Sequence, residues 1–264
     1  MNTTDRQYIE KRYLEAFGKP INLDNPRTIS EKLNWLKLND TPRWWLVDKY
    51  EVRRFVANAV GEERLIRLHG VWNSVDAIDV TTLPRQFVLK PTHGSGWVVI
   101  VAENATHDWG ASRSRLREWM QTNYYTRGRE PVYRDIVPRI VAEEYLGDVP
   151  DYKLMCFHGE PKLLYVLSGR FGAKRITFYD LQWNKLPLSV GIAPPSEEYI
   201  PCPDLERMAF IARRLARGIP FVRVDFYQHG DRVLFGEMTF FPGNGFIPHE
   251  PAEWEYVLGD YLQL

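Results

Sequence analysis

Apolar and polar residues alternate with a period of two along residues 221–227. Val222 and Val224 alternate with Arg223 and Asp225, and this pattern predicts a β-strand with one apolar and one charged face. A His-Gly-Asp turn sequence and a second β-rich segment follow. The simplest interpretation is therefore an antiparallel hairpin.

A second hairpin is predicted around a glycine-rich loop. Residues 85–90 form an apolar segment that ends on Lys90, residues 97–102 form another, and the loop between them contains Gly94 and Gly96. Glycines let a backbone approach a polyphosphate closely, and a lysine supplies a charge for the phosphate oxygens. The alternative is an ordinary turn, because most glycine-rich turns bind nothing.

Apolar positions spaced three and four residues apart predict the helices of the chain. They are expected at residues 5–18, 32–38, 48–56, 112–122 and 205–215. Ser30 and Asp204 are the expected N-caps of the second and the last of these helices. Further strands are expected at residues 65–71, 151–157, 162–167 and 176–183, and an irregular connection at 187–203.

The composition is ordinary for a globular protein and agrees with a soluble enzyme. The chain has 264 residues, of which 44% are hydrophobic and 26% are charged. Lys and Arg number 34, as do Asp and Glu, so no general attraction to nucleic acid is implied. There are two cysteines without a disulfide pattern, no apolar leader and no stretch of roughly 20 apolar residues, which predicts a cytoplasmic protein without a transmembrane segment.

Asp225 and Glu237 lie on the two neighbouring strands of the first predicted hairpin. Two carboxylates on one face repel each other unless a cation lies between them, and Mg²⁺ is often held by one or two carboxylates together with phosphate oxygens. Arg223 precedes Asp225 by two residues and shares its face, so it would point at the same phosphates. The alternative is a surface ion pair on an ordinary hairpin.

Five segments, taken together and in order, resemble the ATP-grasp superfamily and, within it, the TupA-like group of teichuronopeptide biosynthesis. The segments are residues 48–53, 87–96, 141–146, 151–157, and 222–227 with 236–240. The resemblance implies an α+β ATP-grasp fold in which two lobes clamp ATP. It also implies a helical N-terminal segment (1–48), a first lobe with the phosphate loop (49–146) and a second lobe with the metal hairpin (147–264).

The resemblance further implies which residues contact ATP. Expected contacts to the phosphates and the loop are Lys49, Lys90, His93, Gly94, Ser95, Gly96 and Lys153. Expected contacts to the adenine and the ribose are Glu143, Glu144, Tyr145, Leu146 and Asp151.

Catalytic, metal and substrate roles follow from the same resemblance. Arg223 and Lys153 would stabilise the transferring phosphoryl group, while Asp225 and Glu237 would hold Mg²⁺. The ligase pattern ends in E-x-N, but this chain has Thr239 in place of the asparagine; its hydroxyl can still coordinate Mg²⁺, and Asn244 on the next loop is an alternative. The expected substrate contacts are Arg170, Arg175 and Asn244. The loop with Arg170, Lys174 and Arg175 would lie near the triphosphate or an acceptor carboxylate, or is simply a solvated loop.

By this resemblance the chain is expected to be an ATP-dependent carboxylate–amine ligase that forms an amide through an acyl phosphate. Its substrates would be an amino acid and a uronic-acid-type sugar of a bacterial surface polysaccharide such as a capsule, with ATP and Mg²⁺ as cofactors. Two alternatives stay open: an ATP-grasp kinase that phosphorylates a sugar hydroxyl, and a non-catalytic nucleotide-binding assembly protein.

Overall fold

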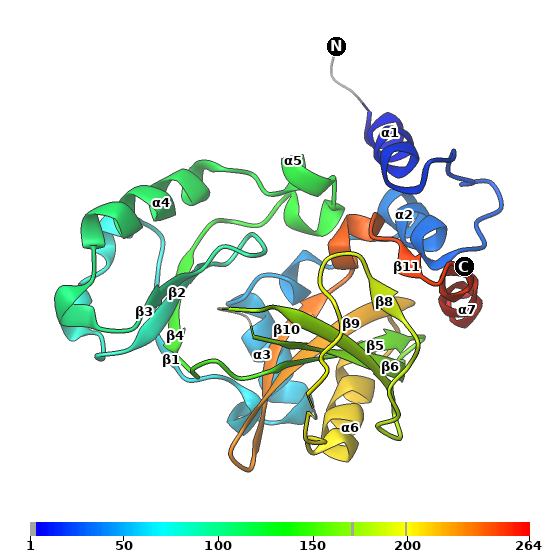
Figure 1. Cartoon of the computed structure of the whole chain (residues 1–264). Coiled ribbons are helices and arrows are strands. Elements are labelled where there is room, and N and C mark those ends of the chain that lie inside the picture. The colour runs from blue at the N-terminus through cyan, green and yellow to red at the C-terminus, as the bar shows by residue number, and fades with distance from the viewer. Residues whose placement is uncertain (1–3, 170–171, 199) are drawn as a thin grey trace. The chain divides into compact units, whose positions relative to one another are not determined.

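The computed structural model describes residues 4–169, 172–198 and 200–264 (Figure 1). The chain forms two compact units. Unit 1 comprises Met1–Thr41 and Asp148–Leu264, and unit 2 comprises Pro42–Gly147. The N-terminal helices therefore belong to the same unit as the C-terminal half of the chain, while unit 2 is one continuous segment. No helix within the described ranges has the length and apolar character needed to cross a membrane.

Unit 2 is a four-stranded antiparallel sheet in the order β1-β4-β2-β3. Its strands are β1 (Leu68–Trp72), β2 (Phe87–Pro91), β3 (Val99–Val101) and β4 (Ile140–Glu144), and its helices are α3 (Glu51–Val60), α4 (Trp109–Gln121) and α5 (Tyr125–Gly128). Helix α4 lies alongside β2 and β3 (Figure 1). Its Leu116 is fully buried in a core with Phe87, Leu89 and Ile140, which fixes the strands on either side of the glycine-rich loop.

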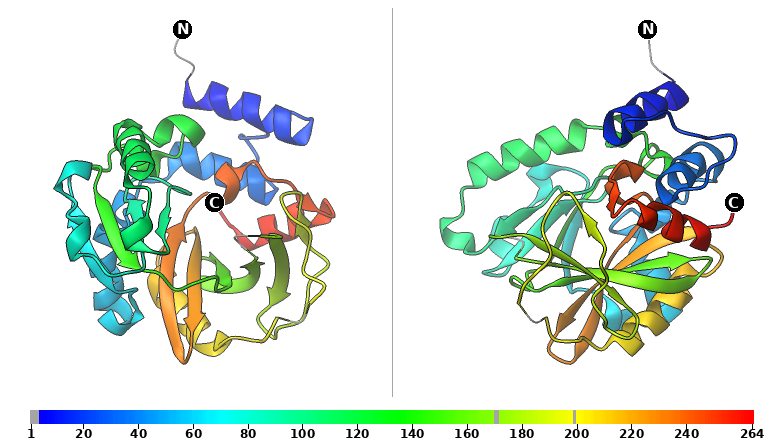
Figure 2. Two further views of the ribbon diagram at one scale, coloured as in Figure 1. Left: turned by 60° about the vertical axis from the view of Figure 1, so that its left-hand side comes forward. Right: turned by 45° about the vertical axis from the view of Figure 1, so that its right-hand side comes forward.

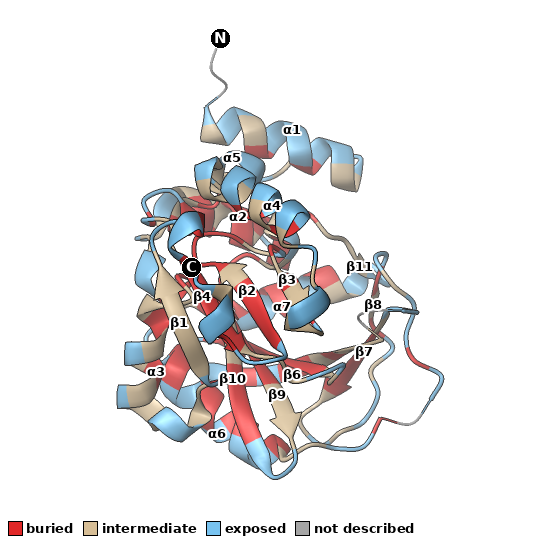
Figure 3. Ribbon diagram, turned by 90° about the vertical axis from the view of Figure 1, so that its left-hand side faces the viewer, coloured by how far each residue is buried: buried red, intermediate tan, exposed pale blue. Residues whose placement is uncertain are grey.

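Unit 1 is built on a five-stranded antiparallel sheet in the order β10-β9-β5-β6-β7. These strands are β5 (Asp151–Phe157), β6 (Glu160–Ser168), β7 (Arg175–Asp180), β9 (Phe221–His229) and β10 (Arg232–Thr239). Helix α6 (Leu205–Ala216) buries Met208, Ile211 and Leu215 and packs against β5, β6 and β9. The β9–β10 hairpin is buried along its strands and exposed at its turn (Figure 3).

The two ends of the chain meet in unit 1. Helices α1 (Asp5–Phe17) and α2 (Ile29–Asn39) come from the N-terminus, and the short strand β11 (His249–Glu250) and helix α7 (Glu253–Tyr261) come from the C-terminus. Both views of Figure 2 show the red C-terminal helix beside the blue N-terminal helices. The Lys32 ammonium donates to the carbonyl oxygens of Gly259 and Leu262 at 2.9 and 2.8 Å, which ties α2 to the end of α7.

Two local predictions need correction. Thr28, not Ser30, is the N-cap of α2: its hydroxyl accepts from the Glu31 N–H while the Glu31 carboxylate accepts from the Thr28 N–H, a reciprocal capping box. The hydroxyl of Ser30 donates instead to Glu255, 225 residues away. The strand predicted at 176–183 ends at Asp180, because the Asp180 carboxylate accepts from two following backbone N–H groups and closes a turn.

Candidate active site

Three charged residues and one tyrosine of unit 1 form a row across four strands. Strand pairing places Glu237 opposite Asp225, Asp225 opposite Lys153, and Lys153 opposite Tyr165. Residues opposite one another in antiparallel strands point to the same face of the sheet. Four side chains from β10, β9, β5 and β6 are thereby brought together, although they lie up to 84 positions apart in sequence.

A β-bulge at Gly236 creates the Asp225–Glu237 alignment. The β9–β10 register shifts between Phe235 and Glu237, so that Gly236 is an extra residue in β10. A Cβ atom at position 236 would lie 3.0 Å from the Tyr227 ring and 3.1 Å from the Asp225 carbonyl oxygen. Glycine therefore permits the close approach that turns Glu237 toward Asp225.

Asp225 lies at the centre of the cluster, with 2% of its side chain exposed. Its carboxylate accepts two hydrogen bonds from Arg223, at 2.6 and 2.7 Å, and one from the ammonium of Lys153. Burial raises the pKa of Asp225 above its ordinary value, and the attraction of Arg223 and Lys153 reduces this rise. Because two cations donate to this one carboxylate, its ionised form is the one that the contacts satisfy.

The Arg223 guanidinium connects the oxygen atoms around it. Besides Asp225, it donates to the hydroxyl oxygens of Tyr165 and Thr239 at 2.8 and 2.9 Å and to the carboxylate of Glu237 at 3.3 Å. It is 8% exposed. In this structure the Arg223 guanidinium therefore donates only to oxygen atoms of the protein among the contacts described above. Its contact with a phosphate stays a prediction.

Lys153 lies between two acids. Its ammonium contacts Asp225 and is 3.8 Å from the carboxylate of Asp151, which is itself buried. Burial lowers the pKa of Lys153, but the attractions of Asp225, Asp151 and Tyr165 together outweigh this effect, so the pKa lies above its ordinary value. The cluster thus contains three carboxylates (Asp151, Asp225 and Glu237) and two cations, Lys153 and Arg223.

The donor chemistry of this cluster fits Mg²⁺. No group of three or more His, Cys, Asp or Glu side chains suited to a metal occurs in the described part of the chain, but Mg²⁺ commonly takes only one or two protein carboxylates and fills its shell with phosphate and water oxygens. Asp225, Glu237 and the Thr239 hydroxyl offer three hard oxygen donors around Arg223. Glu237 is the accessible member, with 36% of its side chain exposed.

Asn244 lies in the short 3₁₀ segment Pro242–Gly245 of unit 1, in a left-handed conformation with φ of 58°. Its carbonyl oxygen accepts from the ammonium of Lys37 on α2. Arg175 begins β7 opposite Ser168, and Arg170 lies outside the described residues. The substrate roles of Asn244, Arg170 and Arg175 stay predictions.

In unit 2, Lys90 and Glu143 lie on the neighbouring strands β2 and β4 and contact each other. The Lys90 ammonium donates to one Glu143 oxygen at 2.9 Å, and Arg53 from α3 donates to the other at 3.0 Å. The resemblance implies an adenine contact for Glu143; in this structure both of its carboxylate oxygens contact cations. Glu144 continues β4, and Tyr145 and Leu146 follow it, half-buried. The adenine contacts of residues 143–146 stay predictions.

Contacts with helix α4 and with Lys49 hold the glycine-rich loop in place. His93 is 2% exposed, and its Nε2 atom lies 3.0 Å from the carbonyl oxygen of Trp119 on α4. Burial lowers the pKa of His93, which keeps the ring neutral at pH 7. The Lys49 ammonium donates to the Gly94 carbonyl oxygen. Only the tip, Ser95 and Gly96, is half-buried or exposed, so the side chain of His93 supports the loop.

Trp97 packs against the glycine-rich loop, a contact that was not predicted from the sequence. A Cβ atom on Gly94 would lie 2.4 Å from its indole ring, which is stacked on Trp119 with ring centroids 5.9 Å apart. Sequence reasoning also missed Arg53 and Tyr165. The sequence itself gives no signal for these three residues, because each acts through a partner at least 22 positions away or through a ring contact.

A family model for TupA-like ATPgrasp proteins matches residues 31–263. The chain therefore belongs to the TupA-like ATPgrasp family, and the predicted α+β ATP-grasp fold is confirmed. No curated protein sequence matches the chain.

Solved structures that match the chain include two ligases and one synthetase. D-alanine–D-alanine ligase from Bacillus anthracis matches at 14% identity and a TM-score of 0.44, over 74% of this chain and 57% of that one. N5-carboxyaminoimidazole synthetase from Staphylococcus aureus complexed with ADP matches at 11% and 0.48, over 83% and 52%. The ATP-grasp ligase PsnB complexed with its minimal precursor matches at 13% and 0.46, over 87% and 66%. The chain thus spans about half to two thirds of their length.

Proposed function

We propose that this protein is an ATP-dependent carboxylate–amine ligase that forms an amide through an acyl phosphate. The observation that carries the proposal is the row of Glu237, Asp225 and Lys153 with Arg223, buried except at Glu237, in a chain of the ATPgrasp family. Carboxylates and cations that are fixed on a sheet before a polyanion arrives stabilise transferring phosphoryl groups with little reorganisation.

Each part of the cluster has a task in this proposal. Asp225 and Glu237, with the Thr239 hydroxyl, would hold Mg²⁺, which neutralises charge on the β- and γ-phosphate oxygens. Lys153 and Arg223 keep their charge because Asp225 lies against both. They would spread the charge that builds on the γ-phosphoryl group when a substrate carboxylate oxygen attacks phosphorus and the bond to ADP breaks.

The loop of unit 2 would bind phosphate through its backbone. Its accessible tip offers the N–H groups of Ser95 and Gly96, and Gly96 adopts φ of 73°, a conformation that other residues rarely tolerate. Lys90 would exchange its contact with Glu143 for a phosphate oxygen. Glu143 would retain Arg53 as a partner during this exchange.

The second chemical step needs an amine. Its nitrogen attacks the acyl carbon, phosphate leaves, and the nitrogen loses a proton to give the amide. As substrates we infer an amino acid and a uronic-acid-type sugar of a bacterial surface polysaccharide, acted on in the cytoplasm. This inference is supported by the resemblance to the teichuronopeptide-biosynthesis group.

The test measures ADP release from Mg-ATP with uronic acids alone, with amino acids alone and with both. A ligase releases ADP only with both substrates and yields an amide product of the corresponding mass. Glu237→Gln should reduce turnover roughly 100-fold, whereas Glu160→Gln, which alters an exposed ion pair with Arg213, should not. ADP release with a sugar alone and a phosphorylated product would identify the kinase instead. ATP binding without turnover across the panel would favour the assembly protein.

A further inference from the structure

Thr92 lies at the start of the glycine-rich loop of unit 2, and all of its polar groups are hydrogen-bonded. It follows β2 directly and is fully buried. Its N–H donates to the Arg139 carbonyl oxygen at 2.8 Å, and its hydroxyl oxygen accepts from the Arg139 N–H at 3.3 Å. Its carbonyl oxygen accepts from the Lys49 N–H at 3.3 Å. Thr92 thereby joins three segments of the chain where the loop begins.

The side chain of Arg139 holds the segment that leads into α3. Its guanidinium forms ion pairs with Asp48 at 2.9 Å and with Glu51 at 2.8 Å, and it lies 4.8 Å from the centroid of the Tyr50 ring. Asp48 is fully buried, and its second oxygen accepts from the N–H groups of Tyr50 and Glu51. The ion pair of Arg139 with Asp48 therefore fixes the backbone at the start of α3.

Lys49 connects this segment with the loop. It follows Asp48 in sequence, its N–H donates to Thr92, and its ammonium donates to the carbonyl oxygen of Gly94. The loop is therefore held at residue 92 through backbone and side chain, and at residue 94 through an ammonium. A loop that is fixed before its ligand arrives loses less conformational freedom on binding.

We propose that Thr92 and Arg139 are positioning residues for the phosphate-binding loop. They hold the loop backbone in the conformation whose N–H groups receive the nucleotide phosphates, and they act on the nucleotide through the loop. Backbone donors that are aimed in advance bind a polyanion with little reorganisation. The inference rests on the proposed function for the identity of the ligand, but the order of the loop can be measured without any ligand.

Hydrogen–deuterium exchange with millisecond labelling of the full chain tests the positioning directly. Thr92→Val keeps the shape of the side chain but removes the oxygen that accepts from Arg139, so peptides spanning residues 92–96 should exchange roughly fivefold faster, as expected for the loss of one hydrogen bond. Thr92→Ser retains this oxygen and should exchange as the wild type does. Arg139→Met leaves the buried Asp48 without its ion pair and should accelerate exchange of the same peptides at least roughly tenfold.

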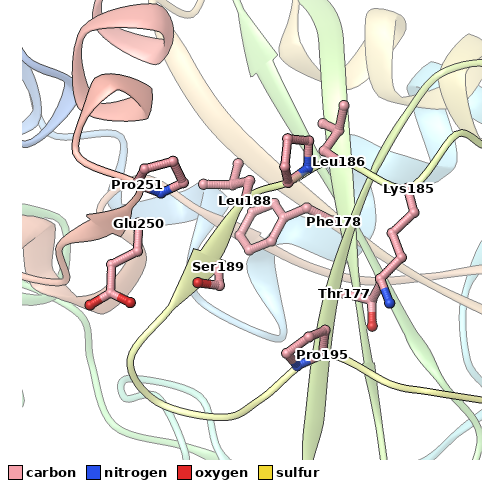
Figure 4. Close-up of a pocket in the computed structure, with 10 residues that line it drawn as sticks. Thr177, Phe178, Lys185, Leu186, Leu188, Ser189, Pro195, Glu250 and Pro251 are labelled. Carbon is pink, nitrogen blue, oxygen red and sulfur yellow. The ribbon is translucent and has the colours of Figure 1, made fainter.

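Two control variants separate positioning from a general loss of stability. Ile78→Val deletes one buried methyl group from the core of unit 2. Lys185→Met removes a cation that donates to a backbone carbonyl oxygen in unit 1, that of Ser196, at 2.9 Å. Lys185 lines a cavity beside β7 and β8 (Ser189–Val190), as Figure 4 shows. Neither control should accelerate exchange at residues 92–96.

Calorimetry with Mg²⁺ and the non-hydrolysable ATP analogue AMP-PNP connects the loop with its ligand. Thr92→Val should bind the analogue roughly fivefold more weakly than the wild type, whereas Thr92→Ser and Ile78→Val should bind it as the wild type does. Lys90→Met removes a cation that is proposed to contact phosphate, and it therefore tests the proposed function independently of Thr92.

The outcomes distinguish the inference from the proposed function. Unchanged exchange at residues 92–96 in Thr92→Val and Arg139→Met, or equal acceleration in Ile78→Val, would overturn the inference alone. Normal binding of the analogue by Thr92→Val, together with weak binding by Lys90→Met, would also overturn it. A wild type that does not bind the analogue would overturn the proposed function, while exchange still decides whether Thr92 orders the loop. If Arg139→Met does not fold, the comparison of Thr92→Val with Thr92→Ser decides.

Discussion

Replacing Asp225 by asparagine should destabilise the protein strongly, because it removes the charge between two buried cations. The Asp225 carboxylate accepts from Arg223 at 2.6 and 2.7 Å and from Lys153. Asparagine has nearly the same shape, but it is neutral, and its NH₂ group would face N–H donors. Arg223 and Lys153, each with 9% of its side chain exposed, would then remain buried with a poorer partner.

The expected loss of stability depends on the partners that Arg223 and Lys153 keep in the variant. Removing one partner of a buried ion pair costs roughly 3–5 kcal/mol. Arg223 keeps Glu237 at 3.3 Å and Lys153 keeps Asp151 at 3.8 Å, so we expect the lower end, about 3 kcal/mol. For a protein of this size that lowers the Tm by roughly 6–12 °C. Glu237→Gln alters a carboxylate that is 36% exposed, and solvent screening should limit its effect to about 1 kcal/mol or less.

Thermal and urea unfolding followed by circular dichroism at pH 7 compare the wild type with both variants. A Tm of Asp225→Asn within 2 °C of the wild type, or equal losses in the two variants, would refute the assignment of Asp225 as the buried centre. The pH dependence adds a second check. Since Asp225 raises the pKa of Lys153, the stabilisation is complete below the unfolded value near 10.5 and is lost as the pH rises through the folded value. The advantage of the wild type should therefore shrink in strong alkali.

Three further predictions concern single residues. Gly94→Ala should weaken Mg-ATP binding at least roughly tenfold, because the added Cβ atom would lie 2.4 Å from an indole ring; Gly191→Ala, where the added atom meets nothing within 4 Å, should bind normally by calorimetry. Iodoacetamide should modify Cys202, which is exposed, and spare the buried Cys156, whose pKa is raised by burial; two adducts by native mass spectrometry would contradict this. Because burial lowers the pKa of His93, the unfolded chain takes up its proton first below about pH 6.5. Urea stability should fall there, and a His93→Gln variant with the same acid slope would contradict this assignment.

Local patterns predicted the elements of the fold well. The period of two in residues 221–227 correctly placed Arg223 and Asp225 on one face of a strand, and the loop between β2 and β3 is flanked by strands as expected. These features depend on neighbours in sequence, so the sequence specifies them. The N-cap of α2 was misplaced, because Ser30 and Thr28 are both good capping residues and the local capping-box partner of Thr28, Glu31, was not used to choose between them.

Pairing between distant segments explains most of what the sequence did not predict about the site. The contact between Glu143 and Lys90, for example, was not predicted: the antiparallel pairing of β2 with β4 brings Glu143 beside Lys90, which lies 53 positions earlier. A strand pattern states which residues share a face, but not which strand lies next to it. The contact between Glu143 and Lys90 therefore depends on the order of the strands in the sheet.

The two bulges show how a single extra residue decides the chemistry of the cluster. Simple counting from the β9–β10 turn would pair Asp225 with Gly236 and would turn Glu237 to the apolar face with Val224; the bulge corrects this by one position. In the β5–β6 hairpin the register also shifts by one, so that Lys153 faces Tyr165 where counting from the turn would give Leu164. Without both shifts, the row would have neither its second carboxylate nor the hydroxyl that accepts from Arg223. Since a slip of one residue moves every later side chain to the other face, the alternation along each strand is correct from sequence, while the composition of the cluster depends on bulges that the alternation does not reveal.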